Sequence, residues 1–412
     1  MSDIQHAHLY GTRDNKYEWL LNHDVSSTTW TELEPQKPFH LFIPQNNDLL
    51  GEYQAYWKIT EAMPVNVLGF QTHRDHFAID FDQEKLKQRI SEMRDGNISD
   101  SEYSKKYDVK DNRDWKIREV RRKIRNNSDW EKDVIECSYR PFDPRPCYFS
   151  YVAMDRPRRE LLDHVAGREN ISMLLIRQMQ DKVPYSHVLS SCIPSIDRVF
   201  SCSRGAATVF PLYLYFDRNS LTQERRPNFS AVFLKDIVVK LDYTPTPEAI
   251  FYYIYAVFHS PTYRSRYAQF LKIDFPRVPL TSNVDLFRQL SAYGEALVAL
   301  HLMKSPKLDT LNTQFVDAGG DLAVDPGHPK YDEGSSSVLI NKKGDKFTGV
   351  PKAVWEFYVG GYQVCYKWLK DRKGRTLSED DITHYQRIVV ALQETMRLMQ
   401  QIDEAIPSFP IE

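Results

Sequence analysis

The sequence predicts an α+β protein with a β-rich lobe, a charged helical arm and a C-terminal lobe of mixed helices and strands. Three observations predict this class: β-prone runs recur between residues 135 and 216, a highly charged stretch spans 82–130, and apolar residues recur at helical spacing from residue 250 onward. At 412 residues the chain is long enough for two or three lobes, because single cores stop growing near about 250–300 residues.

We divide the chain into three segments. Residues 1–65 are rich in Trp, Tyr and Pro, with short extended pieces such as Phe39–Pro44, and are expected to form a docking segment. Residues 66–245 are expected to form the β-rich lobe, with the helical arm at 82–130 broken near Asn97–Asp100. Residues 246–412 are expected to form the C-terminal lobe.

Strands of the β-rich lobe are predicted where β-branched and aromatic residues form short runs. Phe77–Phe81 alternates just before the arm and predicts a strand there. The runs after the arm are Ile135–Tyr139, Cys147–Val152, Ile171–Ile176, His187–Leu189, Val199–Ser201 and Val209–Phe216.

The C-terminal lobe starts with a clear helix signal. Thr246 followed by Pro247 predicts a capped start, and Ser260 with Pro261 predicts a break. A second amphipathic helix is expected near 286–301, and strands are expected within 335–362 around a Lys-Gly-Asp turn. Ser378 with an acidic residue three positions later predicts a capping box before a long last helix.

The composition favours a folded cytoplasmic protein. Hydrophobic residues make up 42% and charged residues 27% of the chain, so pervasive disorder is not expected. The five cysteines form no Cys-x-x-Cys pair, which argues against a disulfide framework and a zinc ribbon. Neither a leader pattern nor about 18 uninterrupted apolar residues is found, so no membrane or secreted protein is expected.

Catalytic motifs are missing from the sequence. There is no Gly-rich loop ending in Gly-Lys-Ser/Thr, and in Phe142–Tyr148 (FDPRPCY) Arg145 separates two prolines that an amino-methyltransferase motif keeps adjacent. His73 and His76 lack further ligands at a suitable spacing, so we expect neither a metal nor a catalytic residue in this chain.

Three sets of basic residues nevertheless predict contacts with nucleic acid, although the net charge is only −2. Arg113–Arg125 forms a basic amphipathic helix that suits phosphates, with a solvated face and internal ion pairs as the alternative. Arginines at strand ends of the β-rich lobe suit guanine edges or phosphates, because the planar fork matches paired acceptors. Basic residues near 342–346 and 367–375 suit a phosphate clamp, with a solvated loop as the alternative.

Arg177 and Gln178 are the most suggestive pair, because they directly follow the apolar run Ile171–Ile176. They combine a guanine-type fork with an adenine-type amide, and together with Arg198 they are the expected base readers. A buried salt bridge at the strand end is the alternative. The complete set of expected contacts is Arg74, Arg118, Arg121, Arg122, Arg145, Arg177, Gln178, Arg198, Arg204, Lys342, Lys343, Lys346, Lys367, Arg372, Lys373 and Arg375.

Several separated blocks resemble the C-terminal target-recognition region of type ISP restriction–modification enzymes. The resemblance extends from about Val65 to Ile402. His8–Leu20 and Thr31–Pro44 are similar to the stretch where the family's adenine methyltransferase domain runs into that region. The blocks are Tyr139–Asp143 (YRPFD), Asp155–Glu160 (DRPRRE), Phe210–Tyr215 (FPLYLY), Phe251–Pro279 and Val354–Asp381.

The resemblance implies a module that reads an asymmetric site in double-stranded DNA. The module would present an adenine to an associated adenine methyltransferase, which uses S-adenosylmethionine and flips the base out. No cofactor is expected in this chain itself. The implied partners are DNA, the methyltransferase and a helicase-like translocase with a nuclease, so the chain is a separate specificity subunit or a fragment.

Shared blocks are expected to be scaffold, and the loops between them are expected to read bases. These loops are Gln178–Ser186, Ile193–Arg204 and Asn341–Lys346. One alternative is an enzyme, either a divergent methyltransferase or a nuclease, that uses Asp143 or the carboxylates of Asp80–Lys85. A second alternative is an interaction adaptor that reads no DNA.

Overall fold

The computed structural model describes residues 4–37, 40–44, 46–179, 183–201, 205–216 and 224–411. The chain divides into two compact units, residues 1–54 and residues 55–412. In the first unit, a two-stranded antiparallel sheet flanks a helix that buries no side chain. Its elements are β1 (Ile4–His6), α1 (Arg13–Asn22), β2 (Thr31–Leu33) and α2 (Leu50–Gln54). Phe39, within the predicted extended piece, lies outside the described residues.

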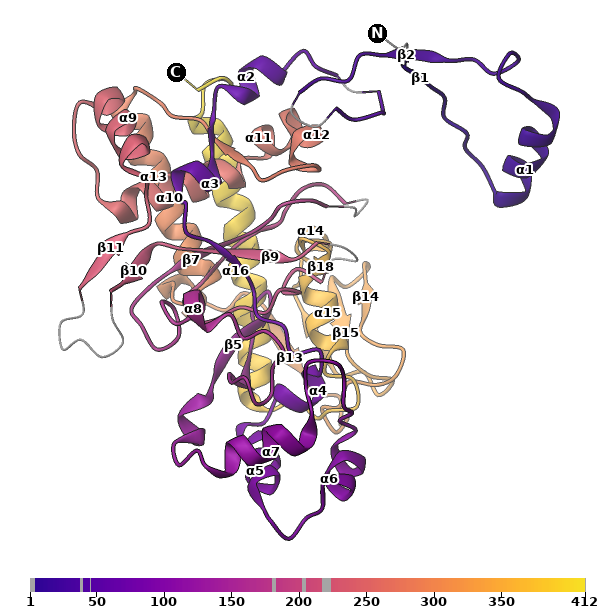
Figure 1. Cartoon of the computed structure of the whole chain (residues 1–412), viewed down its shortest axis with the longest axis vertical. Helices are drawn as coiled ribbons and strands as arrows, with labels where there is room; N and C mark the ends of the chain where they lie inside the picture. Colours follow the sequence, from indigo (N-terminus) through magenta and orange to yellow (C-terminus); the bar gives the residue numbers. More distant parts are fainter. Residues whose placement is uncertain are drawn as a thin grey trace. The chain divides into compact units, whose positions relative to one another are not determined.

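The second unit is an α+β fold, as predicted, around a four-stranded antiparallel sheet (Figure 1). Every residue of its strands β7, β8 and β9 is buried, so both faces of these strands are covered by other elements. The strand order is β4 (Val67–Leu68), β9 (Ala207–Pro211), β7 (Ser172–Ile176) and β8 (Val188–Ser191).

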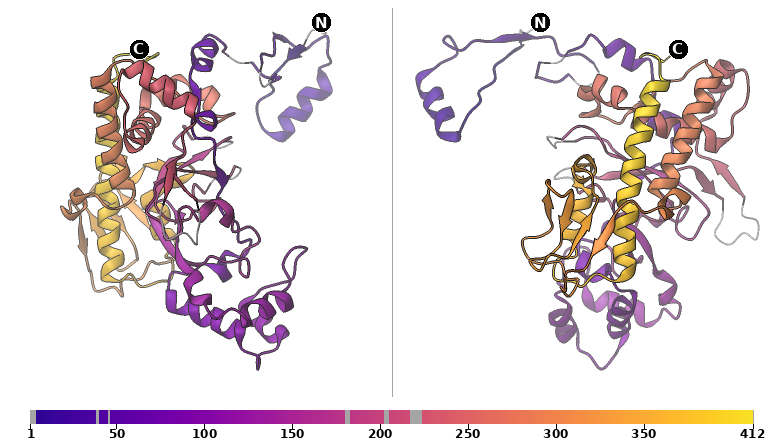
Figure 2. Two further views of the ribbon diagram at one scale, coloured as in Figure 1. Left: turned by 60° about the vertical axis from the view of Figure 1, so that its left-hand side comes forward. Right: turned by 180° about the vertical axis from the view of Figure 1, so that it is seen from behind.

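Three long helices pack together beside the sheet (Figure 2). They are α10 (Pro247–His259), α13 (Val284–His301) and α16 (Glu379–Ala405). The local signals are confirmed: the Thr246 side chain accepts from the Ala249 amide, and Ser378 and Asp381 form a reciprocal capping box. Helices α10 and α13 approach closely at Gly294, where a Cβ would lie 1.8 Å from the Tyr252 carbonyl oxygen.

The charged stretch forms the predicted helical arm. Asp82 caps the first helix through the amides of Glu84 and Lys85, and the predicted break separates the first two helices. Buried Leu86, Ile90 and Ile124 give the arm its small core. Its elements are α5 (Gln83–Arg94), α6 (Asp100–Tyr107), α7 (Ile117–Arg125) and the 3-10 turn η1 (Trp130–Asp133).

Smaller elements surround the sheet and helices. Two hairpins are β5 (Val134–Arg140) with β6 (Asp143–Tyr148), and β10 (Tyr213–Tyr215) with β11 (Arg225–Pro227). A second sheet has the order β13 (Gln314–Val316), β16 (Lys346–Thr348), β15 (Ser337–Leu339) and β14 (Lys330–Asp332). Near α16 lie α14 (Lys352–Trp355), the hairpin β17 (Tyr358–Val359) with β18 (Tyr362–Gln363), and α15 (Val364–Lys370). The short helices α11 (Pro261–Arg266) and α12 (Ala268–Leu271) follow α10, and β3 (Trp57–Lys58) pairs with β12 (Arg277–Val278).

Some predicted strands are wrong. Residues 77–81 contain the end of a helical turn, α4 (Asp75–Ala78), followed by a single bridge at Ile79, and residues 199–201 form a turn. The strand expected at 147–152 ends at Tyr148, and most of 346–362 is turn and helix after Pro351. The apolar residues Phe77, Val199 and Phe200 are indeed buried, but in turns. Short apolar runs, and at residues 77–81 their alternation, therefore misled the strand prediction.

Two buried histidines between α10, α13 and α16 make stability depend on pH. Burial, with the charge of Arg264, lowers the pKa of His301 from 6.5 to about 3 and that of His259 well below its ordinary value. The unfolded chain therefore takes up protons at these sites first as the pH falls below about 6.5. We expect the free energy of unfolding to fall between pH 7 and pH 5, by up to about 1.4 kcal/mol per pH unit for each proton.

Urea unfolding at several pH values tests this expectation. H301Q should reduce the slope of the free energy of unfolding against pH by the contribution of up to one proton. H23Q, at an exposed site in the first unit, should leave this slope unchanged. A free energy of unfolding that is constant from pH 7 to pH 5 would contradict the assignment of neutral buried histidines.

Candidate nucleic-acid interface

One end of the central sheet gathers segments that are far apart in the sequence. The antiparallel register places Ile176, the last residue of β7, opposite Ala207, the first residue of β9. The Ala207 amide donates to the Asp197 carbonyl oxygen, and the Asp197 amide donates to that of Phe70. Arg177 and Gln178 after β7 therefore lie near the loop that carries Arg198.

Hydrogen bonds connect Arg198 to Arg140 and to Gly205 at this end of the sheet. An Arg198 terminal nitrogen donates to the Gly205 carbonyl oxygen at 2.9 Å, and an Arg140 nitrogen donates to the Arg198 carbonyl oxygen at 3.1 Å. The side chains of Arg177 and Arg198 are 64% and 49% exposed, which leaves them accessible to a ligand. With Lys367, described below, Arg140, Arg177, Gln178 and Arg198 form what we call the sheet-end cluster.

Gly205 packs closely against the backbone at Gln178. Its φ is +95°, and a Cβ there would lie 2.6 Å from the Gln178 carbonyl oxygen and 2.5 Å from the Ile176 Cδ1 atom. On the other side, the Met179 amide donates to the Lys272 carbonyl oxygen. The backbone at Gln178 is thus held between two neighbouring segments, which suits a group that must meet a ligand in one orientation.

The Gly360-Gly361 turn between β17 and β18 docks on the same end of the sheet. The Gly360 amide donates to the Ser186 carbonyl oxygen, and the Gly361 amide donates to that of Phe200. Lys367 Nζ donates to the Gly361 carbonyl oxygen at 2.7 Å and to Ser201 Oγ at 3.4 Å. The structure therefore brings Lys367 of the third predicted set to the second set.

Four of the expected DNA contacts instead lie in the interior. Arg121 is 1% exposed and donates to Asp100 and to the carbonyl oxygens of Met93, Asp95 and Ile98, so it holds the end of α5. Arg74 is 5% exposed and is paired with Asp155. Their guanidinium groups already have internal partners, so we assign them to the fold.

Arg145 and Arg372 form a buried ion network around Asp143. Both donate to Asp143, at 2.6 and 3.0 Å, and Arg372 also pairs with Asp381. Arg145, Arg372 and Arg375 each stack on the Phe81 ring, at 3.9 to 5.1 Å from its centroid. The network joins the β5–β6 hairpin to the loop before α16, so Arg145 and Arg372 position this loop and do not face solvent.

Two carboxylates of the enzyme alternative, Asp143 and Asp80, are paired with arginines, whereas Glu84 of the same alternative is exposed. Asp143 is 1% exposed and is occupied by two arginines, Asp80 is paired with Arg89, and Asp82 caps α5. His73 pairs with Asp155, and a ring nitrogen of His76 lies 3.2 Å from the Asp108 carbonyl oxygen. In the part of the chain that the structure describes, no group of three or more acidic, His or Cys side chains is arranged to hold a metal.

The remaining expected contacts lie at the surface. Arg118 and Arg122 are exposed on the outer face of α7, and neither has a carboxylate partner among the described residues. Lys342 and Lys343 are exposed on the β15–β16 turn. The segment 323–325 contacts both this turn and the loop of Lys373, so the structure brings these lysines together. Lys346 and Arg375 are half-buried, and Arg204 lies outside the described residues.

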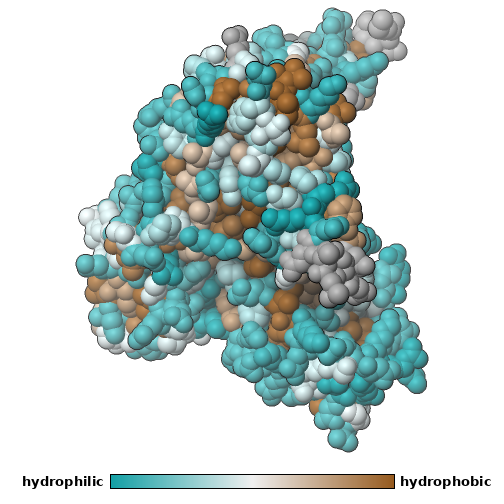
Figure 3. Space-filling model, turned by 90° about the vertical axis from the view of Figure 1, so that its left-hand side faces the viewer, coloured by the Kyte–Doolittle hydropathy of each residue, from teal (hydrophilic) through white to brown (hydrophobic). Residues whose placement is uncertain are grey.

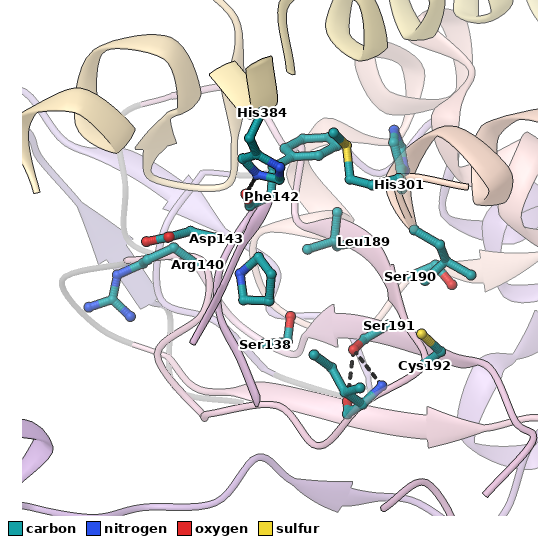
Figure 4. A pocket seen from close by; sticks show the side chains of 14 residues that line it. Ser138, Arg140, Phe142, Asp143, Leu189, Ser190, Ser191, Cys192, His301 and His384 are labelled. Atoms are coloured by element: carbon teal, nitrogen blue, oxygen red, sulfur yellow. Dashed lines mark hydrogen bonds between the residues drawn. The ribbon is translucent and has the colours of Figure 1, made fainter. Parts of the chain in front are cut away.

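A small, partly open pocket of about 120 Å³ lies where the β5–β6 hairpin meets β8, α13 and α16 (Figure 4). The Ser190 and Ser191 hydroxyls donate to the carbonyl oxygens of Ser172 and Ile193, and a ring nitrogen of His384 lies 2.7 Å from the Phe142 carbonyl oxygen. The Arg140 guanidinium extends away from the other lining side chains. No hydrogen bond joins a hydroxyl or thiol to a histidine within the described lining residues; the hydroxyl partners of His301 are Tyr255 and Thr395, which are not part of the lining.

The surface of the second unit is mainly hydrophilic on the face shown in Figure 3, with apolar residues in separate patches. Within the described ranges, no helix is long and apolar enough to cross a membrane.

Sequence reasoning missed several residues that build this surface. Asp274 lies 3.2 Å from Arg177, and Gly205 packs on Gln178, although neither carries a motif. The pairing of Arg177 with Asp274 spans 97 positions, a separation at which no local pattern reports contact.

Comparisons with known proteins bear on this arrangement. The family model "Type ISP C-terminal specificity domain" matches residues 61–401. No curated protein matches the chain by sequence. Among solved structures, the DrdV–DNA complex is similar with a TM-score of 0.71 and 20% identity over 94% of this chain and 42% of that one.

Two further structures are similar. A nuclease-deletion mutant of the Type ISP restriction-modification enzyme LlaGI, with a DNA substrate mimic, has a TM-score of 0.67 and 20% identity, covering 98% of this chain and 32% of that one. The ATP-dependent Type ISP enzyme LlaBIII, bound to DNA, has a TM-score of 0.69 and 17% identity, covering 95% of this chain and 26% of that one. The chain thus spans less than half the length of each of these three proteins.

Proposed function

The chain belongs to the Type ISP C-terminal specificity domain family, and from this membership we propose that it recognises a short sequence in double-stranded DNA for a restriction–modification system. One observation carries the proposal: the sheet-end cluster presents exposed Arg177, Gln178 and Arg198 from a rigid, buried sheet. Guanidinium and amide groups on such a support suit bidentate contacts with purine edges in the major groove.

Two surfaces outside the cluster supply phosphate contacts in this proposal. They are the outer face of α7 with Arg118 and Arg122, and the surface formed by Lys342, Lys343 and Lys373. Half-buried Lys346 and Arg375 are further expected phosphate contacts outside the cluster, whereas Lys367 belongs to the cluster itself. Basic groups of this kind neutralise phosphates and fix register, and they carry no sequence information themselves.

The direct test is selection from a randomised duplex pool by the purified 412-residue chain at two salt concentrations, with sequencing of the bound fraction. Enrichment of one short asymmetric site that persists at higher salt supports the proposal. Binding without enrichment, both alone and with a candidate methyltransferase, contradicts it and favours an adaptor that reads no DNA.

Loss of Arg177 and loss of Lys373 should have different effects. R177A should cost about 1–3 kcal/mol at one base pair and relax specificity there, whereas K373A should weaken all sequences similarly. Competition binding with the selected site and its single-base variants measures both effects. Equal effects of the two changes at every position would refute this division of roles.

The outer face of α7 should contribute to the salt dependence of binding. The double variant R118A/R122A should reduce the slope of log K against log salt by about 2, because each phosphate contact contributes about 0.9. R113A is the matched control on the same arm, since Arg113 is exposed but already paired with Asp114 through two nitrogens. An unchanged slope in the double variant would remove this face from the interface.

We propose an adenine methyltransferase as the partner, with S-adenosylmethionine bound there and not in this chain. The helicase-like translocase and nuclease follow from the same family membership. Residues 1–65 are then the methyltransferase-proximal docking segment. We also propose the cytoplasm as the compartment, because a reducing environment suits the free thiols of Cys137, Cys147, Cys192 and Cys365.

A further inference from the structure

Among the residues that the structure describes, Asp274 places a carboxylate beside the exposed guanidinium of Arg177. Arg177 Nε donates to an Asp274 carboxylate oxygen at 3.2 Å, and the Asp274 side chain is 31% exposed. Asp274 follows α12 in the block Phe251–Pro279, which the sequence marked only as scaffold. Its own amide donates to the Phe270 carbonyl oxygen, so the carboxylate stands on a folded turn.

The geometry of this pair leaves the two terminal nitrogens of Arg177 without a described partner. A guanidinium that contacts guanine end-on uses both terminal nitrogens, for O6 and N7, and does not need Nε. Asp274 engages Nε alone, so it fixes the plane of the fork and leaves the base-reading donors open. Arg198 differs, because one of its terminal nitrogens already donates to Gly205.

The backbone of both partners is held together as well. The Met179 amide donates to the Lys272 carbonyl oxygen at 3.2 Å, which ties the segment after β7 to the segment that carries Asp274. Gly205 packs against the Gln178 carbonyl oxygen on the opposite side of this segment. Movement of the fork is therefore restricted at its backbone and at its Nε.

We propose that Asp274 is a positioning residue for base recognition, which orients Arg177 toward one guanine of the target site. This inference rests on the proposed function. The positioning role can be distinguished from a simple effect of charge on DNA affinity. A carboxylate next to DNA repels phosphates, so by charge alone its removal strengthens binding to every sequence. Removing Asp274 should therefore lower discrimination at one base pair while it leaves binding to unrelated duplexes unchanged or stronger.

The test uses the duplex selected above and its three single-base variants at every position, in competition binding with the full chain. We expect R177A to abolish discrimination at one base pair, by about 5- to 100-fold. D274A should lower it at the same base pair by about 2- to 10-fold, the effect of one lost hydrogen bond. D274N, whose amide oxygen can still accept from Arg177 Nε but carries no charge, should lower it less. D274E, which keeps a carboxylate, should recover part of this loss, and the double variant R177A/D274A should resemble R177A.

Matched controls separate the outcomes. D285N removes an exposed carboxylate at the start of α13 and should leave the discrimination profile unchanged. Thermal unfolding of the Asp274 variants should match that of the wild type, since the side chain is part-exposed.

If the wild type enriches a site but D274A and D274N change no position, or change all positions equally, the positioning role is overturned while recognition stands. If the wild type enriches no site, the proposed function fails, and the role of Asp274 fails with it.

Discussion

Replacing Asp143 with alanine will lower the free energy of unfolding by about 3–5 kcal/mol. The carboxylate is 1% exposed and accepts from Arg145 at 2.6 Å and from Arg372 at 3.0 Å. Its removal leaves two buried guanidinium groups without their shared counter-charge, and an uncompensated buried charge costs about this much. Urea-induced unfolding measures the loss.

The control for this prediction is K373A, one position after Arg372 but exposed, which should change stability by less than about 0.5 kcal/mol. D143N keeps the shape of the side chain and should still be strongly destabilised, because the amide supplies no negative charge. A loss below about 1 kcal/mol for both Asp143 variants would show that the arginines find other partners, such as Asp371 and Asp381.

Gly294→Ala should be the second severe substitution, with a loss of about 3 kcal/mol or more. An added Cβ would lie 1.8 Å from the Tyr252 carbonyl oxygen, and the obstacle is backbone of α10, which cannot rotate away as a side chain would. The two helices would have to separate along one of the main contacts of the core, and overpacking of this kind costs about 1–3 kcal/mol or more.

Gly96→Ala is the matched control, because no atom lies within 4 Å of a Cβ at this position. It should be neutral or slightly stabilising, since alanine restricts the unfolded chain. Thermal unfolding of both variants decides the matter. A G294A protein with the midpoint of the wild type would mean that α10 and α13 pack less closely than described.

Local signals in the sequence predicted the helix boundaries well. The starts at Pro247 and Glu379 follow from caps whose donor and acceptor are three residues apart, so the pattern is visible in the chain itself. Strands were predicted less well, because the buried turns around Phe77 and Phe200 have the apolar composition of a strand without its pairing.

The candidate site shows the same division. Composition marked the basic residues as a group, but it did not distinguish Arg121, which is 1% exposed, from its exposed neighbour Arg122 on the same helix. Helical geometry turns adjacent residues by about 100°, so one faces the arm core and the other faces solvent. Which face is covered depends on α5 and α6, not on α7 itself.

The sequence by itself determined the α+β class, the capped helices, the charged arm and, through separated blocks, the family of the chain. Only the tertiary structure decided that Arg177, Gln178, Arg198 and Lys367 share one end of a sheet, and that Arg145 and Arg372 share a buried carboxylate. The reason is physical: caps and periodicity are interactions between near neighbours, whereas Arg372 and Asp143 are 229 positions apart and meet only when the chain has folded.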